Sequence, residues 1–142
     1  MKAALSTPVP VELQKLFAAS PFHQALGCTL EPLPAGHANA TGICVRLPFN
    51  PICERENGSA RIHGGVIAAL VDLTGAFAAM AAGGRNVPST SAHITYLRPA
   101  KAAELVAVGR VRRLGRTIGV VDVEISQNEE LVALGRVSVN MK

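Results

Sequence analysis

Aromatic residues are scarce in this chain: they make up 4% of the sequence, with no Trp and a single Tyr. Proteins that bind single-stranded nucleic acids stack the bases on aromatic side chains that lie among basic residues. None of the basic clusters in this sequence is interleaved with aromatic residues. We therefore expect no nucleic-acid partner.

The sequence also lacks several motifs that would indicate a function. Its cysteines, Cys28, Cys44 and Cys53, are odd in number and show no C-x-x-C pairing, which argues against a disulfide scaffold and a zinc site. The first residues contain no apolar run of the secretory type, so we predict a cytoplasmic protein without membrane association. No G-x-S-x-G, Walker or G-x-G-x-x-G motif occurs, so the usual signals of serine-triad hydrolysis and of nucleotide binding are missing.

What the chain does contain is apolar material, with 49% hydrophobic residues in a length of 142, enough for one domain with its own core. We find no repeat or linker and predict a single domain over residues 1–142, in which residues 1–20 form an N-terminal helical segment with a helix at 11–19. The net charge is +4, and the excess lies in residues 85–142, which hold 9 basic and 5 acidic side chains. This excess favours an anionic partner.

The longest apolar run covers residues 66–82 and approaches the length of a membrane span. It is short for that role, carries Asp72 near its centre and is rich in Ala and Gly. A helix that is apolar on nearly every side is surrounded by protein. We therefore predict a buried helix over about residues 64–82, closed by Gly83 and Gly84.

Extended structure is predicted on both sides of this helix. Residues 28–33 and 37–47 look extended, and after Pro88 the apolar residues recur with a period of two, which predicts four strands. We expect each of the four to pair antiparallel with the next, because the connectors are short: residues 99–103, 114–116 and 127–129. The fold class is then α+β, with a sheet that curls around the long helix.

The candidate chemistry lies at the start of that helix. Gly64 and Gly65 allow a close approach to the backbone, and the first N–H groups of a helix have no intrahelical acceptor and lie at the positive end of its dipole. These groups are suited to hold a carbonyl oxygen that becomes negative under attack. Asp72 lies inside the apolar helix, where an unpaired carboxylate is costly, so we expect a functional reason for it.

The spacing of these groups predicts a second subunit. From Gly64 to Asp72 the helix rises by roughly 12 Å, so one carbonyl group cannot contact both residues. If they act on the same atom, they belong to different subunits, as when two such helices pair antiparallel across a two-fold axis. We infer a homodimer with two sites at its interface. A carboxyl group of Asp72 that faces bulk solvent would count against this interpretation.

Each of these residues also has a purely structural interpretation. A buried Asp72 can be a hydrogen-bonded structural group. His63 can orient the loop or cap the helix, and the glycine pair can serve tight helix packing. Asn57 is a common type of turn residue. The functional interpretation gains weight because all of these residues fall on one short stretch.

The stretch from Asn57 to Asp72, with Asn six residues before His63-Gly-Gly and the acid nine after His63, resembles the signature of the PaaI-like thioesterases of the hotdog-fold superfamily. The likeness continues through residues 93–100 and 115–116. It implies a hotdog fold, an antiparallel sheet wrapped around one long central helix. It also implies hydrolysis of acyl-CoA thioesters without metal or cofactor, by a homotetramer built from two dimers.

The resemblance further implies catalytic roles for individual residues. The Gly64 N–H would polarise the thioester carbonyl, helped by the Asn57 side chain, and His63 belongs to the same catalytic set. Asp72 of the partner subunit would act as general base or as nucleophile. Ser89 stands where some members place a hydroxyl near the attacking water. Several relatives carry Ser or Thr where this chain has Ala76, so the hydroxyl that positions water is left open.

The same resemblance suggests residues that contact CoA. Its phosphate groups suit the basic excess after residue 85, and the candidates are Gly65, Arg98, Lys101 and Arg116. The alternative function is a non-catalytic hotdog module that binds acyl-CoA, for which an acid facing the thioester would be unnecessary. A hydratase would need a differently placed pair of His and acid, which the sequence does not offer.

Overall fold

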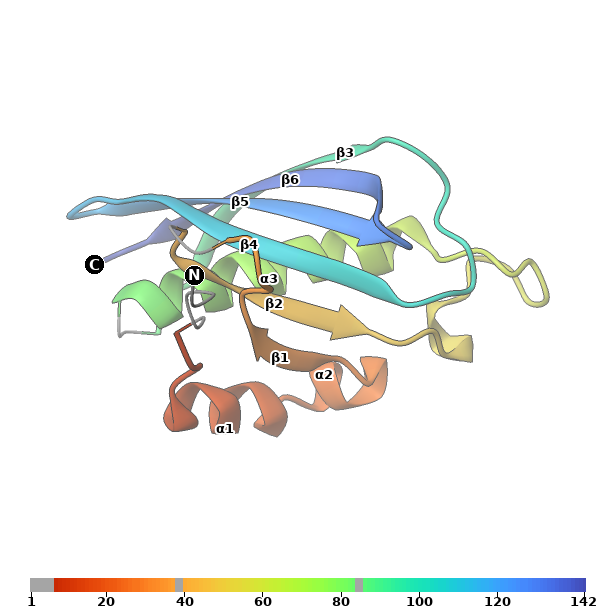
Figure 1. Ribbon diagram of the computed structural model, residues 1–142, viewed down its shortest axis with the longest axis horizontal. Helices are drawn as coiled ribbons and strands as arrows, with labels where there is room; N and C mark the ends of the chain where they lie inside the picture. Colours follow the sequence, from red (N-terminus) through yellow and green to blue (C-terminus); the bar gives the residue numbers. More distant parts are fainter. Residues whose placement is uncertain (1–6, 38–39, 84–85) are drawn as a thin grey trace.

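The computed structural model describes residues 7–37, 40–83 and 86–142, which form a curved sheet around one long helix (Figure 1). The helices predicted at residues 11–19 and about 64–82 are confirmed, whereas the proposed cap residue Gly84 lies outside the described residues. In chain order the elements are α1 (Val11–Ala19), α2 (Pro21–Leu26), β1 (Thr29–Pro32), β2 (Gly42–Leu47), the 3-10 helix η1 (Pro51–Cys53), α3 (Gly64–Gly83), β3 (Ser89–Tyr96), β4 (Leu105–Leu114), β5 (Ile118–Gln127) and β6 (Glu130–Asn140).

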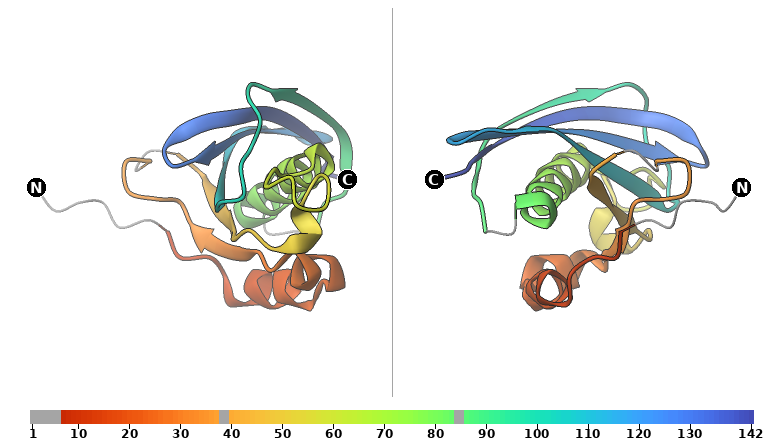
Figure 2. Two further views of the ribbon diagram at one scale, coloured as in Figure 1. Left: turned by 90° about the vertical axis from the view of Figure 1, so that its right-hand side faces the viewer. Right: turned by 60° about the vertical axis from the view of Figure 1, so that its left-hand side comes forward.

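The six strands form one antiparallel sheet in the order β1-β2-β4-β5-β6-β3. Figure 2 shows this sheet arched over α3, with α1 and α2 on the far side of α3 from the central strands. The predicted class, α+β with a sheet wrapped around one central helix, is confirmed. The first predicted strand is found at Thr29–Pro32, and the second narrows to Gly42–Leu47, with residues 38–39 outside the described part.

The predicted order of the last four strands is wrong at one place. β3 pairs with β6 at the edge of the sheet, and not with β4. Its connector over residues 97–104 reaches roughly 26 Å when extended, whereas three strand spacings need about 14 Å. A connector of this length can therefore lead from β3 across β6 and β5 to β4 as easily as it can turn back to an adjacent strand. The shorter connectors at 115–117 and 128–129 do join neighbouring strands, as predicted.

Small residues bring α3 close to the inner face of the sheet. A Cβ atom added to Gly135 would lie 2.3 Å from Val71 Cγ1, and one added to Gly109 would lie 3.0 Å from Thr74 Cγ2. One face of α3 is buried by these contacts, and Leu70 on it is 0% exposed. By length and composition α3 could cross a membrane, but here it is the core helix, with 56% of its most apolar stretch buried in the fold.

Thr74 on this face gives a prediction about stability. The residue is 0% exposed, and its hydroxyl has no hydrogen-bond partner among the described residues. Valine has nearly the same shape without the hydroxyl, so we expect Thr74→Val to raise the free energy of unfolding by about 1 kcal/mol. Equilibrium urea unfolding measures the change. Thr74→Ser, which keeps the hydroxyl and loses the packed methyl, should destabilise the protein. A less stable Thr74→Val would mean that the hydroxyl has a partner in solution.

The outer face of the sheet carries ion pairs across neighbouring strands. Arg110 lies 2.6 Å from Glu124, and Asp122 receives Arg112 at 2.6 Å and Arg136 at 2.7 Å. Hydrogen bonds from Arg136 and then from Arg112 lower the pKa of Asp122 despite its partial burial. Three of the nine basic residues of this part of the chain are therefore engaged by acidic neighbours within the sheet.

Candidate active site at the start of the central helix

The N-terminus of α3 is capped by its own preceding residue. The Nδ1 atom of His63 accepts a hydrogen bond from the Gly65 N–H at 2.8 Å, and the His63 carbonyl accepts one from Val66 N–H at 3.0 Å. The N–H of His63 donates to the carbonyl of Cys53 at 2.8 Å, which ties the helix start to η1. These bonds are those of an N-cap residue. Within the described residues the Gly64 N–H keeps no acceptor, so it remains free for a ligand.

The cap gives a direct test of the role of His63. We expect His63→Ala to lower the free energy of unfolding by about 1 kcal/mol, because the Gly65 N–H loses its acceptor. His63→Asn, whose side-chain oxygen can accept the same bond, should restore both stability and thioester hydrolysis. Thermal unfolding and a thiol-release assay on the two variants separate the roles. A stable but inactive His63→Asn would show that the imidazole itself takes part in the reaction.

A cleft of about 510 Å³ opens beside this helix start. The Tyr96 hydroxyl at its wall donates a hydrogen bond to the Gly64 carbonyl at 3.2 Å. A Cβ atom on Gly64 would point at the Tyr96 ring at 3.5 Å, an ordinary contact distance. Gly64, whose N–H has no acceptor among the described residues, therefore lines this cleft. The lining residues are Arg55, Arg61, Ile62, His63, Gly64, Ile67, Tyr96, Leu97, Arg98, Pro99 and Ala100.

Asp72 does not lie where the sequence predicted. Its side chain is exposed in the single chain, so the prediction that Asp72 is buried within its own chain is wrong. Because Asp72 is exposed, it lies on a side of α3 that neither the sheet nor α1 and α2 cover. Eight residues along α3 separate it from Gly64, roughly 12 Å, so the two do not form a site within one chain. A catalytic role now requires that a second subunit cover this side.

The uncovered side of α3 continues onto the sheet edge. We use the term open face for the exposed or half-buried residues on this side of α3 together with the whole of β3. The residues of β3 are exposed, except for half-buried Ile94. β3 is an end strand of the sheet, so its outer edge has unpaired backbone groups. An edge of this length is normally covered in a native protein. The members on α3 are Gly64, Gly65, Val66, Ala68, Ala69, Asp72, Ala76, Ala82 and Gly83, whereas half-buried Ala81 lies on another side of the helix, toward residues 7–10.

Two further predicted catalytic residues lie apart from the cleft. Asn57 is exposed and lies in the turn at Asn57-Gly58, within the loop between η1 and α3 that projects beyond the sheet in Figure 1. Ser89 is the first residue of β3, and Tyr96 at the cleft is the last, roughly 23 Å away along the strand. The single chain therefore does not bring Asn57 or Ser89 to the Gly64 amide, and their roles stay predictions.

The predicted CoA contacts divide into separate places. Arg98 lines the cleft, and Lys101 follows in the same connector, where its backbone bridges to Arg61. Arg116 is in the turn between β4 and β5, at the end of β4 remote from that connector. The amide of Gly65 is already bound by His63 and is not available to a ligand. Arg98 is thus the one of these candidates that lines the described cleft.

The cysteines are not candidate nucleophiles. Cys28, Cys44 and Cys53 are all buried and free. Burial raises the pKa of each thiol, for Cys44 to about 11, so they remain protonated at neutral pH. A neutral thiol is a poor nucleophile.

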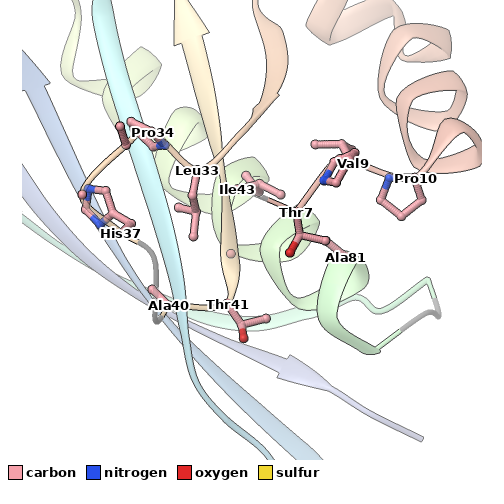
Figure 3. Close-up of a pocket in the computed structure, with 14 residues that line it drawn as sticks. Thr7, Val9, Pro10, Leu33, Pro34, His37, Ala40, Thr41, Ile43 and Ala81 are labelled. Carbon is pink, nitrogen blue, oxygen red and sulfur yellow. The ribbon is translucent and has the colours of Figure 1, made fainter. Parts of the chain in front are cut away.

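A second pocket, of about 170 Å³, lies at the other end of α3 (Figure 3). It is lined by residues 7–10, 33–37 and 40–43 and by Ala81. His37 is the titratable side chain among its described lining residues, and its Nδ1 lies 3.3 Å from an Arg110 nitrogen. This pocket brings no acid or nucleophile toward a ligand, and we assign it no chemistry.

Sequence analysis missed two residues of the cleft, Arg55 and Arg61. They flank the Asn57 turn, and the Arg55 N–H donates to the Arg61 carbonyl at 2.8 Å, which closes the loop. The available signal was the turn itself, since Asn57-Gly58 between two arginines predicts that the chain folds back. Tyr96 was noted only as part of the likeness in residues 93–100, although its hydroxyl is bonded to Gly64.

Comparisons with known proteins show which proteins this chain is similar to. The model of a family described as the thioesterase superfamily matches residues 60–134, which include Gly64 and Asp72. The acyl-coenzyme A thioesterase PaaI of Escherichia coli is 39% identical over 82 residues, which cover 56% of this chain and 58% of PaaI. A Halobacterium salinarum protein with an esterase name is 31% identical over 86 residues, 57% of this chain and 56% of that protein. The chain thus aligns with little more than half the length of these relatives.

The solved structures extend the likeness over most of the chain. The E. coli PaaI protein from the phenylacetic acid degradation operon superposes with a TM-score of 0.75 and 26% identity. The superposition covers 89% of this chain and 87% of the E. coli chain. The arrangement of the sheet around α3 is therefore shared beyond the aligned sequence.

Proposed function

The chain belongs to the thioesterase superfamily and has its hotdog fold, and from this premise we propose that it hydrolyses acyl-CoA thioesters at a site shared by two subunits. The observation that carries the proposal is that Gly64, whose N–H has no acceptor among the described residues, lines a cleft at the positive end of α3. The likeness to PaaI, named an acyl-coenzyme A thioesterase, supports acyl-CoA as the substrate class.

The first step is polarisation of the thioester carbonyl. Its oxygen accepts a hydrogen bond from the Gly64 N–H, and the aligned peptide dipoles of α3 favour the negative charge that develops there. His63 keeps the next amide occupied and holds the helix start in place. The Tyr96 hydroxyl donates a hydrogen bond to the Gly64 carbonyl and so helps to hold Gly64 in place. The amide is thus positioned before substrate arrives.

The acid comes from the second subunit. In an antiparallel pair of α3 helices, Asp72 of the partner subunit lies opposite Gly64. Its carboxylate takes a proton from water as the water oxygen attacks the carbonyl carbon, or it attacks that carbon itself and forms an anhydride that water then cleaves. In both routes the C–S bond breaks, the CoA thiolate leaves and takes up a proton, and a free carboxylic acid remains.

The open face supports this dimer. Its α3 residues beside Asp72 are Ala and Gly, which allow a second helix to approach closely. Pairing of two β3 edges across a two-fold axis would satisfy the unpaired backbone groups and continue the sheet. The partner would also enclose Asp72, which the single chain leaves in water. The association of two dimers into a tetramer, and the cytoplasmic location, stay predictions.

The test is turnover by the purified protein. A panel of aromatic and aliphatic acyl-CoAs is supplied, and the release of free thiol is followed. We expect hydrolysis of at least one member, at a rate that scales with protein concentration. Binding of acyl-CoA without thiol release would favour the non-catalytic binding module. A protein inert on every member would overturn the proposed function.

A further inference from the structure

The side-chain amide of Gln127, the last residue of β5, is buried and uses its oxygen and both of its N–H groups. Gln127 is 7% exposed, and its Oε1 accepts a hydrogen bond from the Lys101 N–H at 2.9 Å. Its Nε2 donates to the carbonyls of Lys101 at 2.9 Å and Ala103 at 3.0 Å. Loss of any of these bonds leaves a polar group without its partner, so the amide fixes the backbone that it contacts.

These bonds stand in for a neighbouring strand beside the connector over residues 97–104. In an antiparallel pair, a residue exchanges both its N–H and its C=O with the residue opposite. Lys101 makes this double exchange with the side chain of Gln127 in place of a backbone. One side of the connector is therefore held by a single side chain.

The other side of the connector holds the residues that lead into α3. Residues 60–62 lie antiparallel to residues 100–102, and His63 and Gly64 follow them directly. The bonds between the two segments run from the Ile62 N–H to the Ala100 carbonyl and from the Ala102 N–H to the Ala60 carbonyl, each at 2.9 Å. Both segments line the cleft beside Gly64. The position of the connector thus helps to set where α3 begins.

Gln127 is itself firmly placed. β5 lies between β4 and β6 in the sheet, and central strands are the parts of a fold that open least. Gln127 pairs with Glu130 across the two-residue turn of Asn128 and Glu129, whose positive φ angles of 50° and 64° are those of a tight hairpin. The amide therefore ties the connector to the sheet.

We infer that Gln127 is a positioning residue for thioester hydrolysis, whose amide holds the connector against which the Gly64 N–H is set. This inference rests on the proposed function. Gln127 does not line the cleft, so it acts through the backbone and does not touch the substrate. The bond from the Gly64 N–H strengthens as the carbonyl oxygen becomes negative, so a displaced amide lowers kcat more than it raises KM.

The first variant, Gln127→Met, keeps the length of the side chain and removes all three bonds. We expect kcat for acyl-CoA hydrolysis to fall about tenfold or more, because small displacements in an active site are costly, with KM changed less. The assay is run at a temperature at which circular dichroism shows the variant folded. Amide hydrogen exchange should become faster at Ile62 and His63, whose N–H groups Gln127 does not contact, and should stay unchanged in α1.

The matched control is Gln14→Met. The Gln14 side chain on α1 is half-buried and also donates to a backbone carbonyl, that of Leu30 at 2.9 Å. The same substitution there should leave kcat, KM and the exchange at Ile62 and His63 at their wild-type values. An equal loss of kcat in both variants would overturn the inference, because it would reflect a general loss of stability.

A second variant, Gln127→Asn, keeps the test decisive if Gln127→Met does not fold. Its amide is one methylene shorter and cannot reach Lys101 and Ala103 together, so we expect a folded protein with a kcat below that of wild type and KM changed less. Wild-type kcat in a folded Gln127 variant, or unchanged exchange at Ile62 and His63, would overturn the inference while the proposed function stands. A wild type inert on every acyl-CoA would instead overturn the proposed function, and the inference with it.

Discussion

Replacing Asp72 with Asn is expected to lower kcat for acyl-CoA hydrolysis by at least about a hundredfold, because the amide can neither take a proton from water nor attack the carbonyl carbon. The substitution keeps the size of the side chain. Asp72 is exposed in the single chain, so the fold of each subunit should tolerate the substitution. Steady-state thiol release and thermal unfolding together measure the effect.

The control for this experiment removes another exposed carboxylate. Glu12 on α1 pairs with Lys15 at 3.2 Å, with its side chain 86% exposed, and Glu12→Gln should keep full activity. Asp72→Ala should behave like Asp72→Asn, since both lack the carboxylate. A folded Asp72→Asn with wild-type kcat would remove the acid from the mechanism and leave Gly64 without a catalytic partner.

A charge in the middle of the open face should separate the subunits and abolish activity. Ala68 lies midway between Gly64 and Asp72 on α3, so in an antiparallel pair it faces its own copy. Arg at this position would place two positive charges together in a closely packed interface, which is strongly unfavourable. We expect Ala68→Arg to be a folded monomer with no measurable thioesterase activity.

Sedimentation or light scattering measures the mass of Ala68→Arg, and circular dichroism checks its fold. Ala18→Arg makes the same substitution at an exposed position of α1 outside the open face, and it should stay dimeric and active. A wild type that is monomeric and active, or an Ala68→Arg that hydrolyses acyl-CoA as a monomer, would contradict the shared site.

The fold was largely predictable because its signals are local. The period-two pattern after Pro88 and the long apolar run determine the strands and α3 without reference to distant residues. The position of β3 was not predictable in the same way, since a connector over residues 97–104 is long enough for either path. The short helix α2 was missed as well, although Ser20 followed by Pro21 is a common helix start.

The site was predictable in part. The sequence indicates a free amide at Gly64 and offers capping of the helix as one role of His63, but which amide the ring takes depends on its rotamer. The sequence analysis also predicted that Asp72 is buried, and the structure shows it exposed. The apolar pattern of a helix does not tell whether the sheet of the same chain or a second copy of the chain covers a given side. Arg55 and Arg61 were missed because a loop closure is a contact between residues that have no periodic pattern.

The central claim, that each site combines Gly64 of one subunit with Asp72 of the other, is tested most directly by mixing two inactive proteins. Asp72→Asn lacks the acid, and Gly64→Val fills the cleft over the amide. When the two are refolded together in equal amounts, half of the dimers are mixed and each carries one intact site. The account predicts recovery of about a quarter of the wild-type activity. No recovery in a sample shown to contain mixed dimers would contradict it.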